Sequence, residues 1–220
     1  MRARVRFPVK LAWWGGIVLV LAGLQYAARV EGGPPERDVL YEYSVAIGTA
    51  IIYGVMLVIV LAVAGRQREL LALRRPHSWG RALALSLLVL VFVFVTVAVL
   101  ESFLRGGEEQ GLTPTEWKPD LAGAYAANFV VIALFAPFVE ELMYRGLGFS
   151  LLAGFGSWAA ILVVGAAFAA NHGLVRAFPA LFVFGCALAW LRSRTDSVYP
   201  GMLIHALFNG FALVVAVVDT

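Results

Sequence analysis

Charged residues are scarce in this sequence, and that scarcity argues against a soluble fold. Only 14% of the 220 residues are charged, 61% are hydrophobic, and the mean hydropathy is +0.85. Soluble domains are typically about 45–50% apolar and about 25% charged. The net charge is only +3, so the basic residues do not indicate nucleic-acid binding. The composition predicts a polytopic membrane protein.

Several signatures of catalytic and metal sites are also missing. The single cysteine, Cys186, lies in an apolar run, so no intrachain disulfide or CxxC metal site can form, and we expect it to pack in the core. No HExxH or GxSxG motif occurs, which argues against the familiar zinc and serine hydrolase sites. An aspartyl dyad is disfavoured because every aspartate lies in a loop or at the end of an apolar run: Asp38, Asp120, Asp196 and Asp219.

Long apolar runs dominate what remains. A chain of 220 residues has room for about seven spans of roughly 20 residues with short loops, and helices satisfy all backbone groups within one segment. The expected fold is an all-α, polytopic transmembrane helical bundle of about seven spans, six to eight being allowed. We expect one integral-membrane domain, residues 1–220, with three N-terminal spans in 1–120 and a catalytic helical core in 121–220.

The first apolar run follows a basic start and ends near residue 30. Its length, and a Trp13-Trp14 pair that suits a membrane interface, favour a retained first span over a signal peptide. Spans over 41–64 and 82–104 follow. The intervening loop 65–81 holds five arginines, so by the positive-inside rule it is cytoplasmic, as is the N-terminus. We expect an integral protein of a bacterial-type cell membrane.

The second half begins with a mainly apolar stretch, 121–155, that is too long for one span. Pro137 offers a break, because proline removes a helical hydrogen bond and kinks the helix. The sequence Gly154-Phe155-Gly156-Ser157 is a turn signal. Further apolar segments are expected at 158–171, 177–191 and 198–218.

The glutamates and histidines within these apolar segments gather in three short motifs, where Asn171 and Asn209 accompany the two histidines, and His77 lies apart in the basic loop. The motifs are EELMYR (140–145), FAANH (168–172) and HALFN (205–209). A charge at mid-bilayer costs roughly 2.5–3.5 kcal/mol on insertion scales, so such residues are usually functional.

Helical spacing separates the charges of the first motif. Glu141 and Arg145 are four residues apart, with the acid on the N-terminal side, which favours an ion pair. Glu140 is rotated by about 100° from Glu141 and has Tyr144 as its neighbour four residues on. We therefore expect Glu140 to lack a fixed counter-charge and to be available as a general base.

The other two motifs add histidine and asparagine. His172 follows Gly156 by as many residues as Glu140 precedes it, so a hairpin turn there places both at similar depth. Phe168 lies one turn before His172 and either walls the site or simply packs. His205 and Asn209 share one helix face. Counting residues from the last turn places His205 nearer the cytoplasm than His172.

Two chemistries fit this residue set. In the first, Glu140 takes a proton from water with the aid of His172, while His205 and Asn209 donate hydrogen bonds to an oxyanion. In the second, Glu140, His172 and His205 bind a divalent metal such as zinc, with an open position for water. The residues alone leave both open.

The three motifs in this order resemble those of the CPBP family, the CAAX prenyl endopeptidase and bacteriocin-processing proteins, also called Abi or type II CAAX proteases. The family's motifs EExxxR, FxxxH and HxxxN stand here as Glu140-Glu141 with Arg145, Phe168 with His172, and His205 with Asn209. Gly146 after the arginine matches too, and the resemblance covers about residues 135–212.

The resemblance implies a glutamate-dependent intramembrane endopeptidase. It implies that Glu140 and His172 activate water and that His205 and Asn209 form the oxyanion hole. Arg145 is expected to pair with Glu141, with Tyr144 and Phe168 in support. The family has also been described as metalloproteases, so a metal stays open. The implied partners are the lipid bilayer and a membrane-associated peptide or protein, CAAX-type or prenylated substrates included.

Two other functional classes remain. A proton-coupled transporter would also bury glutamate and histidine in a relay, although transporters commonly show internal repeats and paired broken helices, and no repeat is visible here. A non-catalytic membrane scaffold or immunity protein would carry the same residues without using them.

Overall fold

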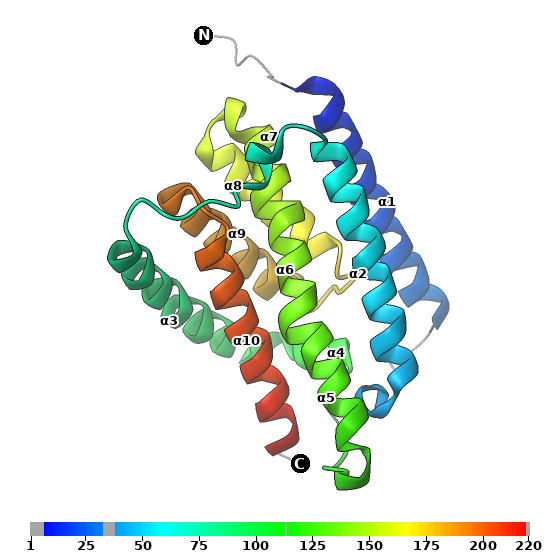
Figure 1. Cartoon of the computed structure of the whole chain (residues 1–220). Coiled ribbons are helices and arrows are strands. Elements are labelled where there is room, and N and C mark those ends of the chain that lie inside the picture. The colour runs from blue at the N-terminus through cyan, green and yellow to red at the C-terminus, as the bar shows by residue number, and fades with distance from the viewer. Residues whose placement is uncertain (1–6, 33–37, 113, 219–220) are drawn as a thin grey trace.

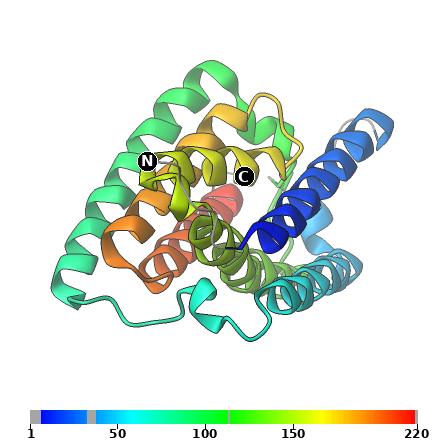
Figure 2. The same cartoon turned by 90° about the horizontal axis from the view of Figure 1, so that it is seen from above.

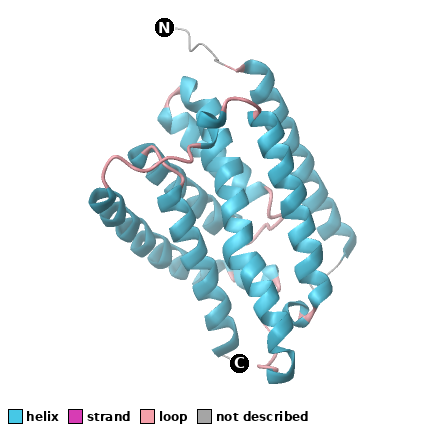
Figure 3. Ribbon diagram, in the orientation of Figure 1, coloured by secondary structure: helices cyan, strands magenta, loops and turns pink. Residues whose placement is uncertain are grey.

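A computed structural model describes residues 7–32, 38–112 and 114–218. Within these ranges the chain is helical and has no strand (Figure 3), which confirms the predicted helical membrane bundle. The helices are α1 (Pro8–Gly32), α2 (Tyr43–Ala64), α3 (Trp79–Leu104), α4 (Gly106–Gln110), α5 (Ala122–Val130), α6 (Ala136–Glu140), α7 (Phe149–Leu152), α8 (Ser157–Ala170), α9 (Phe178–Thr195) and α10 (Tyr199–Val218). Shorter or wider turns are η1 (Val39–Tyr41), η2 (Arg68–Leu71), η3 (Pro119–Leu121), η4 (Val131–Phe135), η5 (Glu141–Gly148) and η6 (Ala153–Phe155).

The segments from η3 to η6 form one continuous helical rod, Pro119–Phe155, of 37 residues. The predicted break at Pro137 is therefore wrong. The five residues of η4 just before it are π-helical, and the Ala136 N–H bonds to the Val131 carbonyl. This wider turn accommodates a ring that would otherwise clash with the preceding turn, so the helix continues. A second π-helical stretch, η5, follows Glu140.

Five helices in the described ranges are long and apolar enough to cross a membrane: α1, α2, α3, the rod and α10. The helices α8, of 14 residues, and α9 complete seven helical elements. The predicted turn at Gly156 is present, with φ of +101°, a conformation that glycine adopts without steric cost. The predicted second, third and final spans coincide with α2, α3 and α10 to within a few residues.

The rod runs through the middle of the bundle, with α1 and α2 on one side and α9 and α10 on the other (Figures 1 and 2). Helix α3 lies outside α9 and α10. Helices α8 and α9 form a tight pair, because a Cβ on Gly185 would come within 2.9 Å of the Gly165 Cα. The rod is therefore the central helix of the bundle, and its residues contact helices on both sides.

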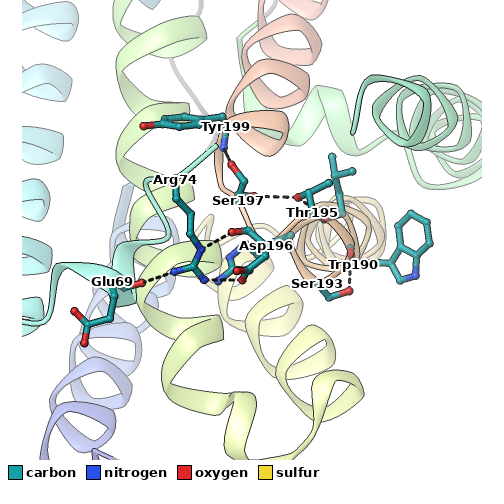
Figure 4. A network of polar contacts seen from close by, with 10 residues as sticks. Glu69, Arg74, Trp190, Ser193, Thr195, Asp196, Ser197 and Tyr199 are labelled. Atoms are coloured by element: carbon teal, nitrogen blue, oxygen red, sulfur yellow. Dashed lines mark hydrogen bonds and ion pairs between the residues drawn. The ribbon is translucent and has the colours of Figure 1, made fainter. Parts of the chain in front are cut away.

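The basic loop between α2 and α3 is a folded element that holds the start of α10. Leu71 and Ala72 are each 1% exposed, and the Val198 N–H bonds to the Ala72 carbonyl. Arg74 bonds to both the backbone and the carboxylate of Asp196 at the α9–α10 turn (Figure 4). The loop 65–81, predicted to be cytoplasmic, thus meets the α9–α10 turn at one end of the bundle. The side of the membrane that this end faces stays a prediction.

Candidate active site

The two adjacent carboxylates of the rod meet one histidine of α10. His205 Nε2 lies 3.4 Å from Glu140 Oε2, and His205 Nδ1 lies 3.1 Å from Glu141 Oε1. All three side chains are buried. Although the carboxylates leave the rod in different directions, the imidazole lies between them. Glu140, which was expected to lack a fixed counter-charge, therefore faces the imidazole of His205.

Glu141 and Arg145 form the predicted ion pair. Arg145 Nη1 donates to Glu141 Oε1 at 2.8 Å, and both side chains are 0% exposed. Arg145 Nη2 donates to the Gly185 carbonyl at 3.2 Å, and its guanidinium lies 4.4 Å from the centre of the Phe168 ring. The arginine therefore ties the rod to α8 and α9 as well as neutralising Glu141.

His205 reaches the two carboxylates because the first turn of α10 packs against the rod. Gly201, in its first turn, lies against the Glu141 carboxylate so closely that a Cβ would overlap Glu141 Oε2. The loop residues Ala72 and Arg74 bond to Val198 and Asp196 of the α9–α10 turn, and these contacts hold the start of α10 in place.

Two tyrosines flank the carboxylates. The Tyr53 hydroxyl of α2 donates to Glu140 Oε1 at 2.6 Å. Tyr144, the expected neighbour of Glu140, is 2% exposed and bonds instead to the Asn171 amide. Sequence reasoning missed Tyr53. The available signal was a hydroxyl in the middle of the apolar second span, but its partner lies 87 residues away.

The FAANH motif lies beside this cluster. The Phe168 ring is 1% exposed and contacts the rings of Tyr144, His172 and His205, with centroids 5.5, 4.7 and 5.6 Å away. His172 Nδ1 lies 2.8 Å from the Phe168 carbonyl. A carbonyl only accepts, so Nδ1 carries the hydrogen and Nε2 has a free lone pair when the ring is neutral. Phe168 thus separates the two histidines and orders both.

The π-helical turns of the rod expose carbonyls that neighbouring helices use. Asn209 Nδ2 donates to the Ile132 carbonyl at 3.1 Å, within η4. Trp14 Nε1 donates to the Met143 carbonyl at 3.0 Å, within η5. Trp14 is 4% exposed and Trp13 is 65% exposed, so only Trp13 fits the expected interface role. Helix α1 is thereby packed onto the motif itself.

The proposed three-residue metal set does not fit the described structure. Within the described ranges, no three or more His, Cys, Asp or Glu side chains are placed to hold one ion. Glu140 and His205 face each other, but the only polar contact of His172 in these ranges is to its own helix. We therefore assign no step of the chemistry to a metal.

An apolar cavity of about 220 Å³ lies between α1 and α2 and reaches the rod. Met143 and Leu147 form its floor, and Trp14, Ile52 and Met56 are among its walls. Met143 is three residues after Glu140. A hydrophobic compartment therefore adjoins the turn of the rod that carries the carboxylates.

Comparison with known families agrees with the motifs. The family model described as type II CAAX prenyl endopeptidase Rce1-like matches residues 122–211. Residues 122–211 are Rce1-like. The family resemblance inferred from the three motifs is thereby confirmed. No curated protein and no solved structure gives a significant match to the chain.

The Rce1-like segment contains the rod from α5 onward, α8, α9 and most of α10. It therefore includes all three motifs and the histidine that joins the two carboxylates. The family that this model describes is one of type II CAAX prenyl endopeptidases. The helices α1 and α2, which supply Trp14 and Tyr53, lie outside the segment.

Proposed function

We propose that this protein is a glutamate-dependent intramembrane endopeptidase that hydrolyses membrane-associated peptides or proteins. The observation that carries the proposal is the buried cluster in which Glu140 and Glu141 face opposite nitrogens of His205, within an Rce1-like segment. A buried, unneutralised carboxylate is costly, so a cluster of this kind at membrane depth is better explained by chemistry than by packing alone.

In the proposed reaction Glu140 takes a proton from the attacking water as the water oxygen bonds to the peptide carbonyl carbon. His172 Nε2, whose lone pair is free, accepts a hydrogen bond from this water and orients it. The proton that Glu140 has taken passes to the leaving nitrogen when the carbon–nitrogen bond breaks. His205, which lies between the two carboxylates, offers a hydrogen bond to the oxyanion. Asn209 uses one N–H on Ile132 and has a second to contribute.

The surrounding residues have supporting roles in this proposal. Arg145 pairs with Glu141, and Glu141 holds the Nδ1 side of His205, so Nε2 is directed at Glu140. The apolar cavity between α1 and α2 suits an aliphatic or prenyl group of the substrate. CAAX-type or prenylated substrates are therefore the class that we propose to test first.

The test is to identify the peptides that accumulate in membranes of cells carrying Glu140→Gln. We expect uncleaved substrate to accumulate with Glu140→Gln and not with Glu69→Gln, a matched change in the loop outside the cluster. If both variants leave the membrane peptides unchanged, the protease proposal fails. Uptake or proton flux in vesicles that is abolished by Glu140→Gln while peptides are unaffected would point to a transporter instead.

A further inference from the structure

Glu140 is held by side chains from two different helices. Its Oε1 accepts the Tyr53 hydroxyl of α2 at 2.6 Å, and its Oε2 faces His205 Nε2 of α10 at 3.4 Å. Glu140 is 6% exposed, so bulk water is not at hand to replace a lost partner. The two contacts fix the rotation of the carboxylate about its last bond. One of them comes from outside the Rce1-like segment.

We propose that Tyr53 is a positioning residue for Glu140, an inference that rests on the proposed function. The shorter contact occupies Oε1, so Oε2 is the oxygen that receives the proton from water. The hydroxyl stabilises the ionised carboxylate, because it donates to a group that only accepts when charged. Helix α2 thus completes a site whose other polar groups all lie within residues 122–211.

The charged and titratable groups around Glu140 come from three elements. The rod supplies Glu141, Tyr144 and Arg145, α10 supplies His205, and α2 supplies Tyr53. Of these, Tyr53 and His205 contact the Glu140 carboxylate directly within the described ranges. Replacing Tyr53 by phenylalanine removes one direct donor and leaves the other charges unchanged.

The first readout needs no substrate. Dicyclohexylcarbodiimide modifies protonated carboxyl groups in apolar surroundings, and mass spectrometry reports the rate at which Glu140 is labelled at one fixed pH. The Tyr53 hydroxyl donates to Glu140 Oε1, so its loss removes a hydrogen bond to the ionised carboxylate. We expect Glu140 to be labelled about tenfold faster in Tyr53→Phe than in the wild type.

The second readout is turnover of a peptide that accumulates in Glu140→Gln membranes. We expect Tyr53→Phe in the full-length, reconstituted protein to lower kcat by about 10- to 100-fold with little change in KM. Tyr125→Phe is the matched control, since Tyr125 donates to the Leu213 carbonyl at 2.6 Å outside the site. The control keeps wild-type labelling and turnover.

Each outcome is decisive. If Tyr53→Phe has the Glu140 labelling rate or the kcat of Tyr125→Phe, the positioning role is overturned. A fall in kcat that is matched by an equal rise in KM would assign Tyr53 to substrate binding instead, and would overturn it too. If Glu140→Gln itself retains full turnover, the proposed function fails, whereas the labelling rate of Glu140 in Tyr53→Phe still decides whether Tyr53 holds its carboxylate.

Discussion

The ion pair between Glu141 and Arg145 leads to a prediction that does not depend on catalysis. Both side chains are fully buried, with 2.8 Å between Nη1 and Oε1. Arg145→Met removes the guanidinium at similar volume and leaves the Glu141 carboxylate with His205 as its remaining partner. Removing one member of a buried pair costs about 3–5 kcal/mol. For a chain of 220 residues this lowers the unfolding midpoint by roughly 6–20 °C.

The matched control is the double variant Glu141→Gln, Arg145→Met. It removes both charges, and replacing a buried pair by neutral groups is often close to neutral for stability. We expect the double variant to recover most of the lost midpoint. The assay is thermal unfolding in one detergent, followed by tryptophan fluorescence. A loss below about 1 kcal/mol for Arg145→Met, or equal losses for single and double variants, would refute charge compensation.

Three further predictions concern a close approach, an acid-sensitive contact and metal dependence. The added Cβ in Gly201→Ala overlaps the Glu141 carboxylate, so we expect the free energy of unfolding to fall by about 1–3 kcal/mol and turnover to fall as well. In Gly210→Ala the Cβ would meet Phe129 at an ordinary 3.4 Å, so stability should change little. Equal effects of the two variants in unfolding assays would contradict this. The hydrogen bonds from Lys118 and from the Thr115 backbone lower the pKa of Asp38 to about 2. The ionised Asp38 therefore contributes to stability above about pH 4, and this contribution is lost as the pH falls through 2. Asp38→Asn should remove this part of the acid unfolding curve. EDTA should leave turnover within about twofold, because the described ranges hold no three-ligand group; loss of activity that zinc restores would show otherwise.

The sequence predicted the membrane bundle well because hydrophobic length is a direct physical requirement of the bilayer. It predicted the Glu141–Arg145 pair because both partners lie on one helix face. It failed at Pro137, where a π-helical turn lets the rod continue. The residues near Pro137 do not reveal this accommodation by themselves. A carbonyl of the π-helical turn, that of Ile132, bonds to Asn209, which lies on another helix.

The site was predictable only in part, for a related reason. The motif residues were found because charged and amide groups are rare in apolar segments. Contacts between helices were not, since Tyr53 and Glu140 are 87 residues apart and share no spacing rule. The contact of His205 with the carboxylates depends on Gly201, which lets α10 approach Glu141, and on the folded loop at Ala72, which holds the start of α10. The role of Trp14 likewise depends on a carbonyl exposed by a π-turn.

The most direct measurement is the turnover of an accumulated membrane peptide by the purified, reconstituted protein, comparing wild type with Glu140→Gln and Glu69→Gln. If Glu140 is the general base, Glu140→Gln lowers kcat by about 10²- to 10⁴-fold and Glu69→Gln leaves it unchanged. Cleavage by Glu140→Gln at the wild-type rate would contradict the assignment of Glu140 and the mechanism built on it.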